Sequence, residues 1–143
     1  MKPRITVITV GVDDLERSFN FYRDGLGLKS EGIIGKEFEH GAVAFFELQH
    51  GLRLAVWPRK SLAHDSGLPL SAPSANEFSL GHNVSSKAEV DVVMAQAKGA
   101  GAFIVKPARK RFGVAMPVTS KIRTIISGKL SGIRSGNWRS AEA

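Results

Sequence analysis

Residues 10–28 read V-G-V-D-D-L-E-R-S-F-N-F-Y-R-D-G-L-G-L, and this stretch decides the fold. The β-branched run that leads into it, Ile5–Val12, predicts a strand. Asp13 or Asp14 is placed to cap a helix, because a carboxylate accepts hydrogen bonds from the free amides of the first turn. One face of this helix is apolar and carries Leu15, Phe19 and Tyr22. Two glycines then end the helix, Gly25 and Gly27.

The same unit occurs a second time along the chain. Residues 78–84, F-S-L-G-H-N-V, predict a strand, and Ser86 with Glu89 forms a capping box. A second apolar helical face carries Val90, Val93, Met94 and Ala97. Residues 98–102, K-G-A-G-A, then match residues 24–28, D-G-L-G-L, and a strand is predicted at Phe103–Lys106. Strand, helix and Gly-x-Gly exit recur in order, which indicates an internal duplication.

A hairpin completes the first unit. Residues 42–48, A-V-A-F-F-E-L, and residues 52–57, L-R-L-A-V-W, predict two strands joined by a turn at Gln49–Gly51. Residues 32–38 fit an edge strand or a loop. We therefore expect an α+β protein of two βαβββ modules. The expected divisions are residues 1–58 for the first module, 59–77 for a Ser- and Pro-containing connector, 78–108 for the start of the second module and 109–143 for an atypical tail.

Composition limits the class of protein. The chain has no Cys, so disulfides and thiolate chemistry do not enter. No apolar run approaches the roughly twenty residues of a membrane helix, and residues 1–10 lack a signal-peptide core, so we expect a cytoplasmic protein without a membrane partner. The net charge of +7 sits entirely in residues 109–143. This basic tail has aromatic residues only at Phe112 and Trp138, so nucleic-acid binding is not expected.

These features together resemble the vicinal oxygen chelate superfamily of glyoxalase I, bleomycin-resistance proteins and extradiol dioxygenases. The resemblance is carried by Thr9–Leu28 with its D-L-x-R-S-x-x-F-Y helix, by F-F-E-L at residues 45–48, by L-R-L-A-V-W-P at residues 52–58 and by residues 81–107. It implies curved sheets that often hold a divalent metal on their inner faces, and it implies frequent pairing into dimers. Fold does not fix function in this superfamily, so each site position has to be considered separately.

The tail departs from the family pattern. Relatives usually continue with a segment similar to F-W-G-G-Y-x-G-Y-F-x-D-P-D-G-H-x-W-E, whereas this tail is rich in Ser, Gly, Arg and Lys. Codons can be chosen for Phe112–Arg134 that, read from the third base of the Phe112 codon, encode W-G-G-Y-A-G-Y-F-K-D-P-D-H-H-L-W-E-V-I-W-N-P. We therefore hypothesise a one-base slip near Lys106–Arg109, in the gene or in its clone. A nucleotide sequence without this second frame in codons 106–129 would contradict the hypothesis.

Such a slip would replace the last two strands of the second module. Residues 113–119 and 122–126 contain enough β-branched residues to form makeshift strands. We expect the tail to be peripheral, irregular or exchanged with another chain. Because exposed strand edges pair with other strands, a homodimer is expected, with strand swapping as one form of it.

The resemblance also implies where metal ligands would lie. The position on the first strand falls on Val7, the position on the hairpin strand on Ala55, and the position in the second module near Ser79, with His82 as the nearest donor. The final Glu belongs to the second frame, where its codon overlaps residues 128–129. Val and Ala offer no donor atom, so no metal cofactor is expected. A divalent metal is the alternative if these positions are misplaced.

The concave sheet is then the expected ligand site. Arg53, Ala55 and Trp57 share one face by strand alternation, and Thr9 is expected on the neighbouring strand. Trp57 is the candidate stacking platform, with core packing as its alternative role. His82 is the fourth candidate, although a structural histidine with a backbone partner is the favoured interpretation.

Three functions remain open. The first is a glyoxalase/bleomycin-resistance-like protein that binds a small, partly aromatic molecule without metal. The second is a metal-dependent lyase or dioxygenase, which about one tightly bound divalent ion per chain would favour. The third is an inactive, frame-shifted remnant whose N-terminal part still folds. The sequence names neither a substrate nor catalytic residues.

Overall fold

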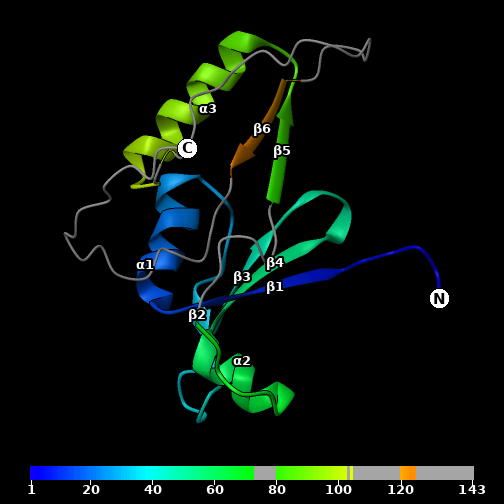
Figure 1. Cartoon of the computed structure of the whole chain (residues 1–143), viewed down its shortest axis with the longest axis vertical. Coiled ribbons are helices and arrows are strands. Elements are labelled where there is room, and N and C mark those ends of the chain that lie inside the picture. Colours follow the sequence, from blue (N-terminus) through cyan, green and yellow to red (C-terminus); the bar gives the residue numbers. More distant parts are fainter. Residues whose placement is uncertain (73–79, 103, 105–119, 125–143) are drawn as a thin grey trace, which may run out of the picture.

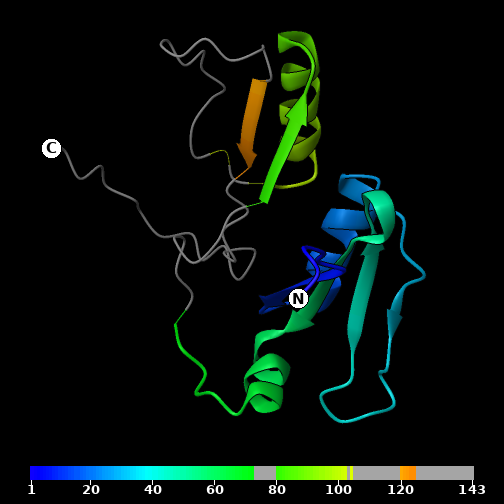
Figure 2. The same cartoon turned by 90° about the vertical axis from the view of Figure 1, so that its right-hand side faces the viewer.

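The computed structural model describes residues 1–72, 80–102, 104 and 120–124 of the chain. The described residues form a mixed α+β fold with two sheets (Figure 1). The helix α3 (Lys87–Gly99) and the two-stranded sheet lie at one end, and the helix α2 (Arg59–Ser66) lies at the other (Figure 2). In chain order the elements are β1 (Val7–Val12), α1 (Leu15–Asn20), η1 (Phe21–Gly25), β2 (Ile33–Ile34), β3 (Val43–Glu47), η2 (Gln49–Gly51), β4 (Arg53–Pro58), α2 (Arg59–Ser66), β5 (Leu80–Val84), α3 (Lys87–Gly99) and β6 (Ser120–Thr124).

The first sheet has the strand order β1-β4-β3-β2. β3 and β4 form the predicted antiparallel hairpin, and β1 pairs parallel to β4. The turn between the hairpin strands contains Gly51 at φ 78°, as expected for a glycine in this position. β2 is an edge strand of two residues, which fits the short, glycine-punctuated segment from which it forms.

The helix after β1 begins at the second of the two candidate caps. The carboxylate of Asp14 accepts from the backbone N–H of Arg17 at 2.9 Å. After Asn20 the backbone widens into the π-helical turn η1, and the chain leaves it through Gly27 at φ 73°. The predicted helix is therefore present, but its second half is π-helical and not α-helical.

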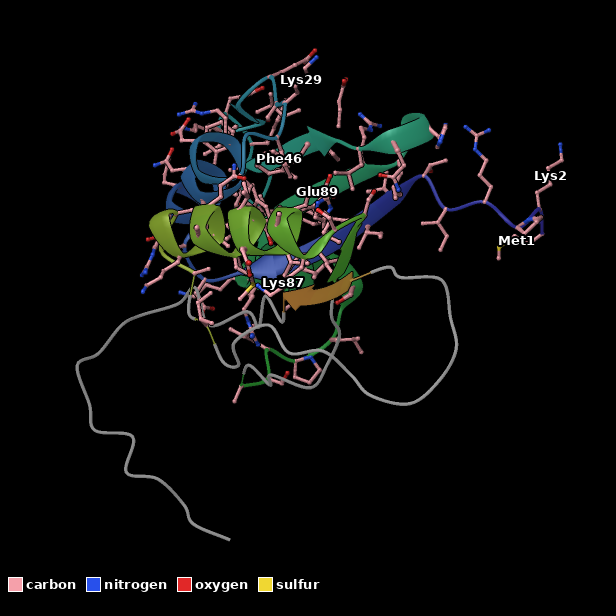
Figure 3. The ribbon with its side chains drawn as sticks, turned by 90° about the horizontal axis from the view of Figure 1, so that it is seen from above. Met1, Lys2, Lys29, Phe46, Lys87 and Glu89 are labelled. Atoms are coloured by element: carbon pink, nitrogen blue, oxygen red, sulfur yellow. The ribbon has the colours of Figure 1, made fainter. Side chains whose placement is uncertain are left out.

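The core lies between α1 with η1 and one face of the first sheet. Phe46 on β3, labelled in Figure 3, is fully buried. Its ring centroid lies 5.9 Å from that of Phe19 and 5.4 Å from that of Tyr22. The predicted apolar helical face is thus confirmed. The remaining buried members of this core are Val10, Val12, Phe21, Ala44, Leu54 and Val56.

The second half repeats the cap and exit of the first. The hydroxyl of Ser86 accepts from the N–H of Glu89 at 3.2 Å, and the Glu89 carboxylate accepts from the N–H of Ser85 at 2.7 Å. This confirms the predicted capping box, except that the Glu89 carboxylate bonds the N–H of Ser85, one residue before the N-cap Ser86. The chain leaves α3 through Gly101 at φ 93°, the counterpart of Gly27.

The two halves contact each other at the ends of their helices. The side-chain amide of Gln96 on α3 donates to the carbonyl oxygen of Gly25 on η1 at 3.1 Å. A Cβ atom at Gly25 would overlap the Cβ of Ala100. Glycine is therefore required at residue 25 by the close approach of the second half, and not by a positive φ.

The segment expected as the connector, residues 59–77, contains a helix that was not anticipated from the sequence. Arg59–Ser66 form the helix α2, which ends at Gly67 in the left-handed conformation with φ 68°. The helix starts directly after Pro58, whose fixed φ suits the entry to a helix. The helix contains two serines, Ser61 and Ser66, although serine is more typical of turns.

The second sheet is described only in part. β5 pairs antiparallel with β6, which overlaps the makeshift strand expected at residues 122–126. The strand expected at Phe103–Lys106, apart from Ile104, and the one expected at residues 113–119 lie outside the described residues. A complete second βαβββ module is therefore not established by the described part of the chain.

Candidate functional site

The first sheet has a second face, which we call the outer face. Alternation along the strands directs its residues away from the α1 side, and they are Val7, Thr9, Gly11, Val43, Phe45, Glu47, Arg53, Ala55 and Trp57. Ala55 on the central strand β4 is in register with Thr9 on one side and Phe45 on the other. Thr9 is exposed, whereas Ala55 is 2% exposed. Three of the four predicted ligand-binding residues (Thr9, Arg53 and Trp57) therefore share this face.

Arg53 is the cationic group of the outer face. It is exposed and lies in register with Glu47 on β3. Its guanidinium carbon lies 5.0 Å from the ring centroid of Phe45, within the range of a cation–π contact. The aromatic ring therefore holds the guanidinium over the sheet.

Trp57 lies at the other end of β4 and is half-buried. Its indole N–H donates to the backbone carbonyl of His40 at 2.9 Å. His40 has a positive φ of 59°, and its ring stacks on that of His64 from α2 with centroids 4.3 Å apart. The indole N–H is thus already hydrogen-bonded within the chain, so Trp57 would contact a ligand through the face of its ring.

The helix α2 closes this end of the outer face. A Cβ atom at Gly11, which is in register with Trp57, would lie 3.0 Å from the Cγ of Arg59 and 3.4 Å from the Cδ2 of Leu62. The guanidinium Nε of Arg59 lies 3.6 Å from a carboxylate oxygen of Asp13. A glycine at residue 11 therefore lets α2 pack directly on the sheet beside Trp57.

His82 occupies a different position from the other three candidates. It is the middle residue of β5, as expected, and its side chain is exposed. β5 belongs to the second sheet, in which His82 is in register with Ile122. The first sheet and its outer face therefore do not include His82, whose role in binding stays a prediction.

The residues at the implied metal positions do not fit a metal ion. Val7 and Ala55 are on the outer face and offer no donor atom, and Ser79 lies outside the described residues. Within the described ranges no three His, Cys, Asp or Glu side chains are grouped so that they could hold a metal. Because divalent ions need several converging N, O or S donors, we derive no step through a metal.

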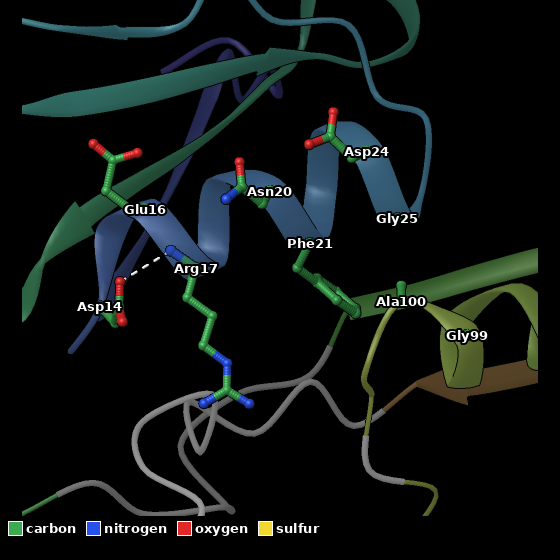
Figure 4. A pocket seen from close by; sticks show the side chains of 9 residues that line it. All are labelled: Asp14, Glu16, Arg17, Asn20, Phe21, Asp24, Gly25, Gly99 and Ala100. Atoms are coloured by element: carbon green, nitrogen blue, oxygen red, sulfur yellow. Dashed lines mark hydrogen bonds between the residues drawn. The ribbon is translucent and has the colours of Figure 1, made fainter.

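A surface groove on the helical side of the fold was not anticipated from the sequence. It has a volume of about 610 Å³ and lies where α1 and η1 meet the end of α3 (Figure 4). The carboxylates that line it are already engaged, since Asp14 caps α1, Glu16 lies 2.9 Å from Lys36 and Asp24 lies 2.6 Å from Arg23. The Arg23 hydrogen bond lowers the pKa of Asp24. Each of these three carboxylates therefore already has a partner within the chain.

Two contributors to the site escaped sequence reasoning. One is the loop carbonyl of His40, because a backbone acceptor leaves no trace in a side-chain pattern. The other is α2, for which the signal was present as Pro58 before the helix and Gly67 after it.

None of the helices in the described part of the chain is long and apolar enough to cross a membrane.

Comparison with known proteins agrees with this architecture. The family model described as the Glyoxalase/Bleomycin resistance protein/Dioxygenase superfamily matches residues 4–117. No match was found among curated proteins.

Solved structures are similar over about three-quarters of the chain. A glyoxalase-related enzyme from Fulvimarina pelagi is 30% identical, with 76% of this chain and 73% of that chain covered and a TM-score of 0.61. A glyoxalase/bleomycin resistance protein/dioxygenase from Nocardioides is 24% identical, with 78% and 70% covered and a TM-score of 0.59. Lactoylglutathione lyase from Agrobacterium tumefaciens is 19% identical, with 74% and 76% covered and a TM-score of 0.52. The last two similarities concern the fold alone.

Proposed function

Because the chain belongs to the glyoxalase/bleomycin resistance protein/dioxygenase superfamily, we propose that it binds a small, partly aromatic molecule on the outer face of its first sheet, without a metal ion. The ligand stacks on Trp57 and extends along β4 past Ala55 towards Arg53 and Thr9. The family does not specify the substrate of this chain. The metal-dependent lyase and dioxygenase activities of the superfamily require metal-binding side chains, and Val7 and Ala55 of this chain cannot supply them.

One observation carries this proposal. A small residue, Ala55, lies between a hydroxyl side chain and an aromatic one, with a cation and an indole two residues away on either side along β4. Pockets for small molecules combine apolar and aromatic walls with a few polar groups in this way. The end wall of α2 and the bond from Trp57 to His40 hold the indole in place, so that stacking costs little ordering of the side chain.

Tryptophan fluorescence tests the proposal directly. The chain has two tryptophans, Trp57 and Trp138, so Trp138→Phe leaves Trp57 as the only tryptophan. We would titrate this variant with 4-phenylbutyrate, 4-phenylbutanamide and 4-phenylbutylamine, whose single benzene ring absorbs little where tryptophan is excited. A saturable change in Trp57 emission with at least one probe is expected. No saturable change with any of the three would contradict the proposed site.

A second candidate is the inactive remnant of a frame-shifted gene. Two features favour it: codons can be chosen for Phe112–Arg134 so that a second frame encodes the usual family ending, and the family match ends at residue 117. That frame would restore a carboxylate at the end of the second module, where the family places a metal ligand. Sequencing codons 106–129 tests the slip. Metal analysis and a thermal melt of the restored-frame protein beside the present chain then test what was lost. Equal stability of the two would count against a damaged second module.

The organisation of the chain is proposed along the same lines. We retain residues 1–58 as the first βαβββ module and residues 78–108 as the start of a second, with residues 59–77, now including α2, between them and residues 109–143 as the atypical tail. We also retain a cytoplasmic homodimer, with strand swapping as one form. Light scattering on the purified chain checks the dimer, and a mass of one chain at all concentrations would contradict it.

A further inference from the structure

Arg53 differs from the other described cations without a carboxylate partner in lying over an aromatic ring of the outer face. Arg23, Lys36, Arg59 and Lys87 each lie within 4 Å of a carboxylate, whereas Arg53 forms no ion pair with any residue that the structure describes. This holds although Glu47 is directly opposite it in the register of β3 and β4. The guanidinium is placed over Phe45 instead.

A guanidinium on an aromatic ring keeps its outward N–H donors available. Arginine stacks through the flat face of its guanidinium, and its N–H groups lie in that plane, where they match the two oxygens of a carboxylate. The contact with Phe45 fixes the side chain and reduces the rotamer entropy that would be lost on binding. Arg53 is therefore preorganised to receive an anionic group over the outer face.

Thr9 supplies a second donor on the same face. Val7 is in register with Arg53, and Thr9 is two residues further along β1, roughly 7 Å from Val7 by the rise of a strand. Its exposed hydroxyl points to the same side of the sheet as Arg53. An anion between these two groups would receive charge-assisted bonds from one and a neutral hydrogen bond from the other.

From these observations we propose that the ligand is an aromatic carboxylate, whose carboxylate is bound by Arg53 and Thr9 and whose ring stacks on Trp57. This inference rests on the proposed function and adds the charge and polarity of the ligand. Arg53 and Trp57 are four residues apart on β4, or roughly 13 Å along the strand, and their side chains shorten this span. A phenyl ring separated from a carboxylate by a short aliphatic chain has a suitable length.

The charge of the probe is the variable to test. 4-Phenylbutyrate, 4-phenylbutanamide and 4-phenylbutylamine share one ring and chain length and carry a negative charge, no charge and a positive charge. In the Trp138→Phe background we expect 4-phenylbutyrate to bind up to about fivefold more tightly than the amide, because charge-assisted bonds are stronger than neutral ones but are screened by solvent at an exposed guanidinium. The amine should bind more weakly than the amide.

Substitution of Arg53 then assigns the preference to this residue. Arg53→Gln should make the butyrate and the amide bind equally, while Arg53→Lys should keep part of the preference, because lysine retains the charge and loses the bidentate geometry. Arg23→Gln is the matched control, since Arg23 is also exposed but lies on η1 and pairs with Asp24. It should leave all three affinities unchanged. A thermal melt checks that each variant folds. If Arg53→Gln does not fold, the relative affinities of the three probes for the Trp138→Phe protein still test whether the site prefers an anion.

The outcomes separate this inference from the function on which it rests. If the amide binds as tightly as the butyrate, the anion preference is wrong while the site stands. If the butyrate is preferred but Arg53→Gln and Arg23→Gln do not alter that preference, Arg53 is not the group responsible. If no probe binds, the proposed function itself is contradicted, and the inference is overturned with it.

Discussion

Two glycines at matching positions of the repeated unit should differ in how substitution by alanine changes the free energy of unfolding. Gly25 and Gly99 occupy matching positions in D-G-L-G-L and K-G-A-G-A. A methyl group at residue 25 would overlap the Cβ of Ala100 and lie 3.3 Å from its Cα, whereas a methyl group at residue 99 meets nothing within 4 Å. Neither glycine has a positive φ, so backbone strain does not enter either comparison.

The expected magnitudes follow from packing and helix propensity. Overpacking costs about 1–3 kcal/mol, and replacing glycine by alanine in a helical turn returns up to about 1 kcal/mol. Gly25→Ala should therefore lower the free energy of unfolding by about 1 kcal/mol. Gly99→Ala should raise it by about 0.5–1 kcal/mol, because only the propensity term applies.

Urea unfolding followed by circular dichroism measures both variants against the parent chain. A third variant, Gly25→Ala combined with Ala100→Gly, removes the methyl group that causes the overlap and should recover most of the loss at residue 25. If Gly25→Ala is as stable as Gly99→Ala, the second half does not approach η1 as described. In that case the contact from Gln96 to the Gly25 carbonyl would also be in doubt.

Three further predictions concern the core of the first sheet. Phe46→Ala should cost about 3–5 kcal/mol in urea unfolding, because Phe46 is fully buried against two aromatic rings, and a loss below 1 kcal/mol would contradict that packing. Ser18→Ala should be neutral or stabilising by about 1 kcal/mol, since the buried hydroxyl has no hydrogen-bond partner among the described residues, whereas a clear loss on thermal melting would reveal one. Burial raises the pKa of Tyr22, the only tyrosine, from 10.0 to about 12, so the absorbance of its phenolate should appear near pH 12. The stability gained by burying the neutral phenol is complete below about pH 10 and is lost towards pH 12. Deprotonation at pH 10 in the folded protein would count against this burial.

Local sequence patterns predicted the elements that depend on local chemistry. Alternation and β-branching identified the strands, and the side chains of Asp14 and Ser86 marked the helix starts, because both signals act within a few residues. The π-helical turn at Phe21–Gly25 was not predictable in this way. Its hydrogen-bond pattern is that of a local insertion into an α-helix, and no side-chain signature specifies it.

The candidate site divides along the same line. Period-two alternation correctly placed Arg53, Ala55 and Trp57 on one face, since a strand leaves no other arrangement. The hydrogen bond from the Trp57 indole to the His40 carbonyl depends on how a loop folds back towards β4. Contacts of this kind between distant segments follow from the tertiary fold and have no counterpart in the pattern of either segment.

Amide chemical-shift mapping with 4-phenylbutyrate tests the central claim most directly, because it reports where on the chain a ligand sits. The account predicts that the largest shifts fall on β1 and β4, around Thr9 and from Arg53 to Trp57, and on Phe45 of β3. Shifts confined to the groove between α1, η1 and α3, or the absence of shifts anywhere at saturating probe, would contradict it.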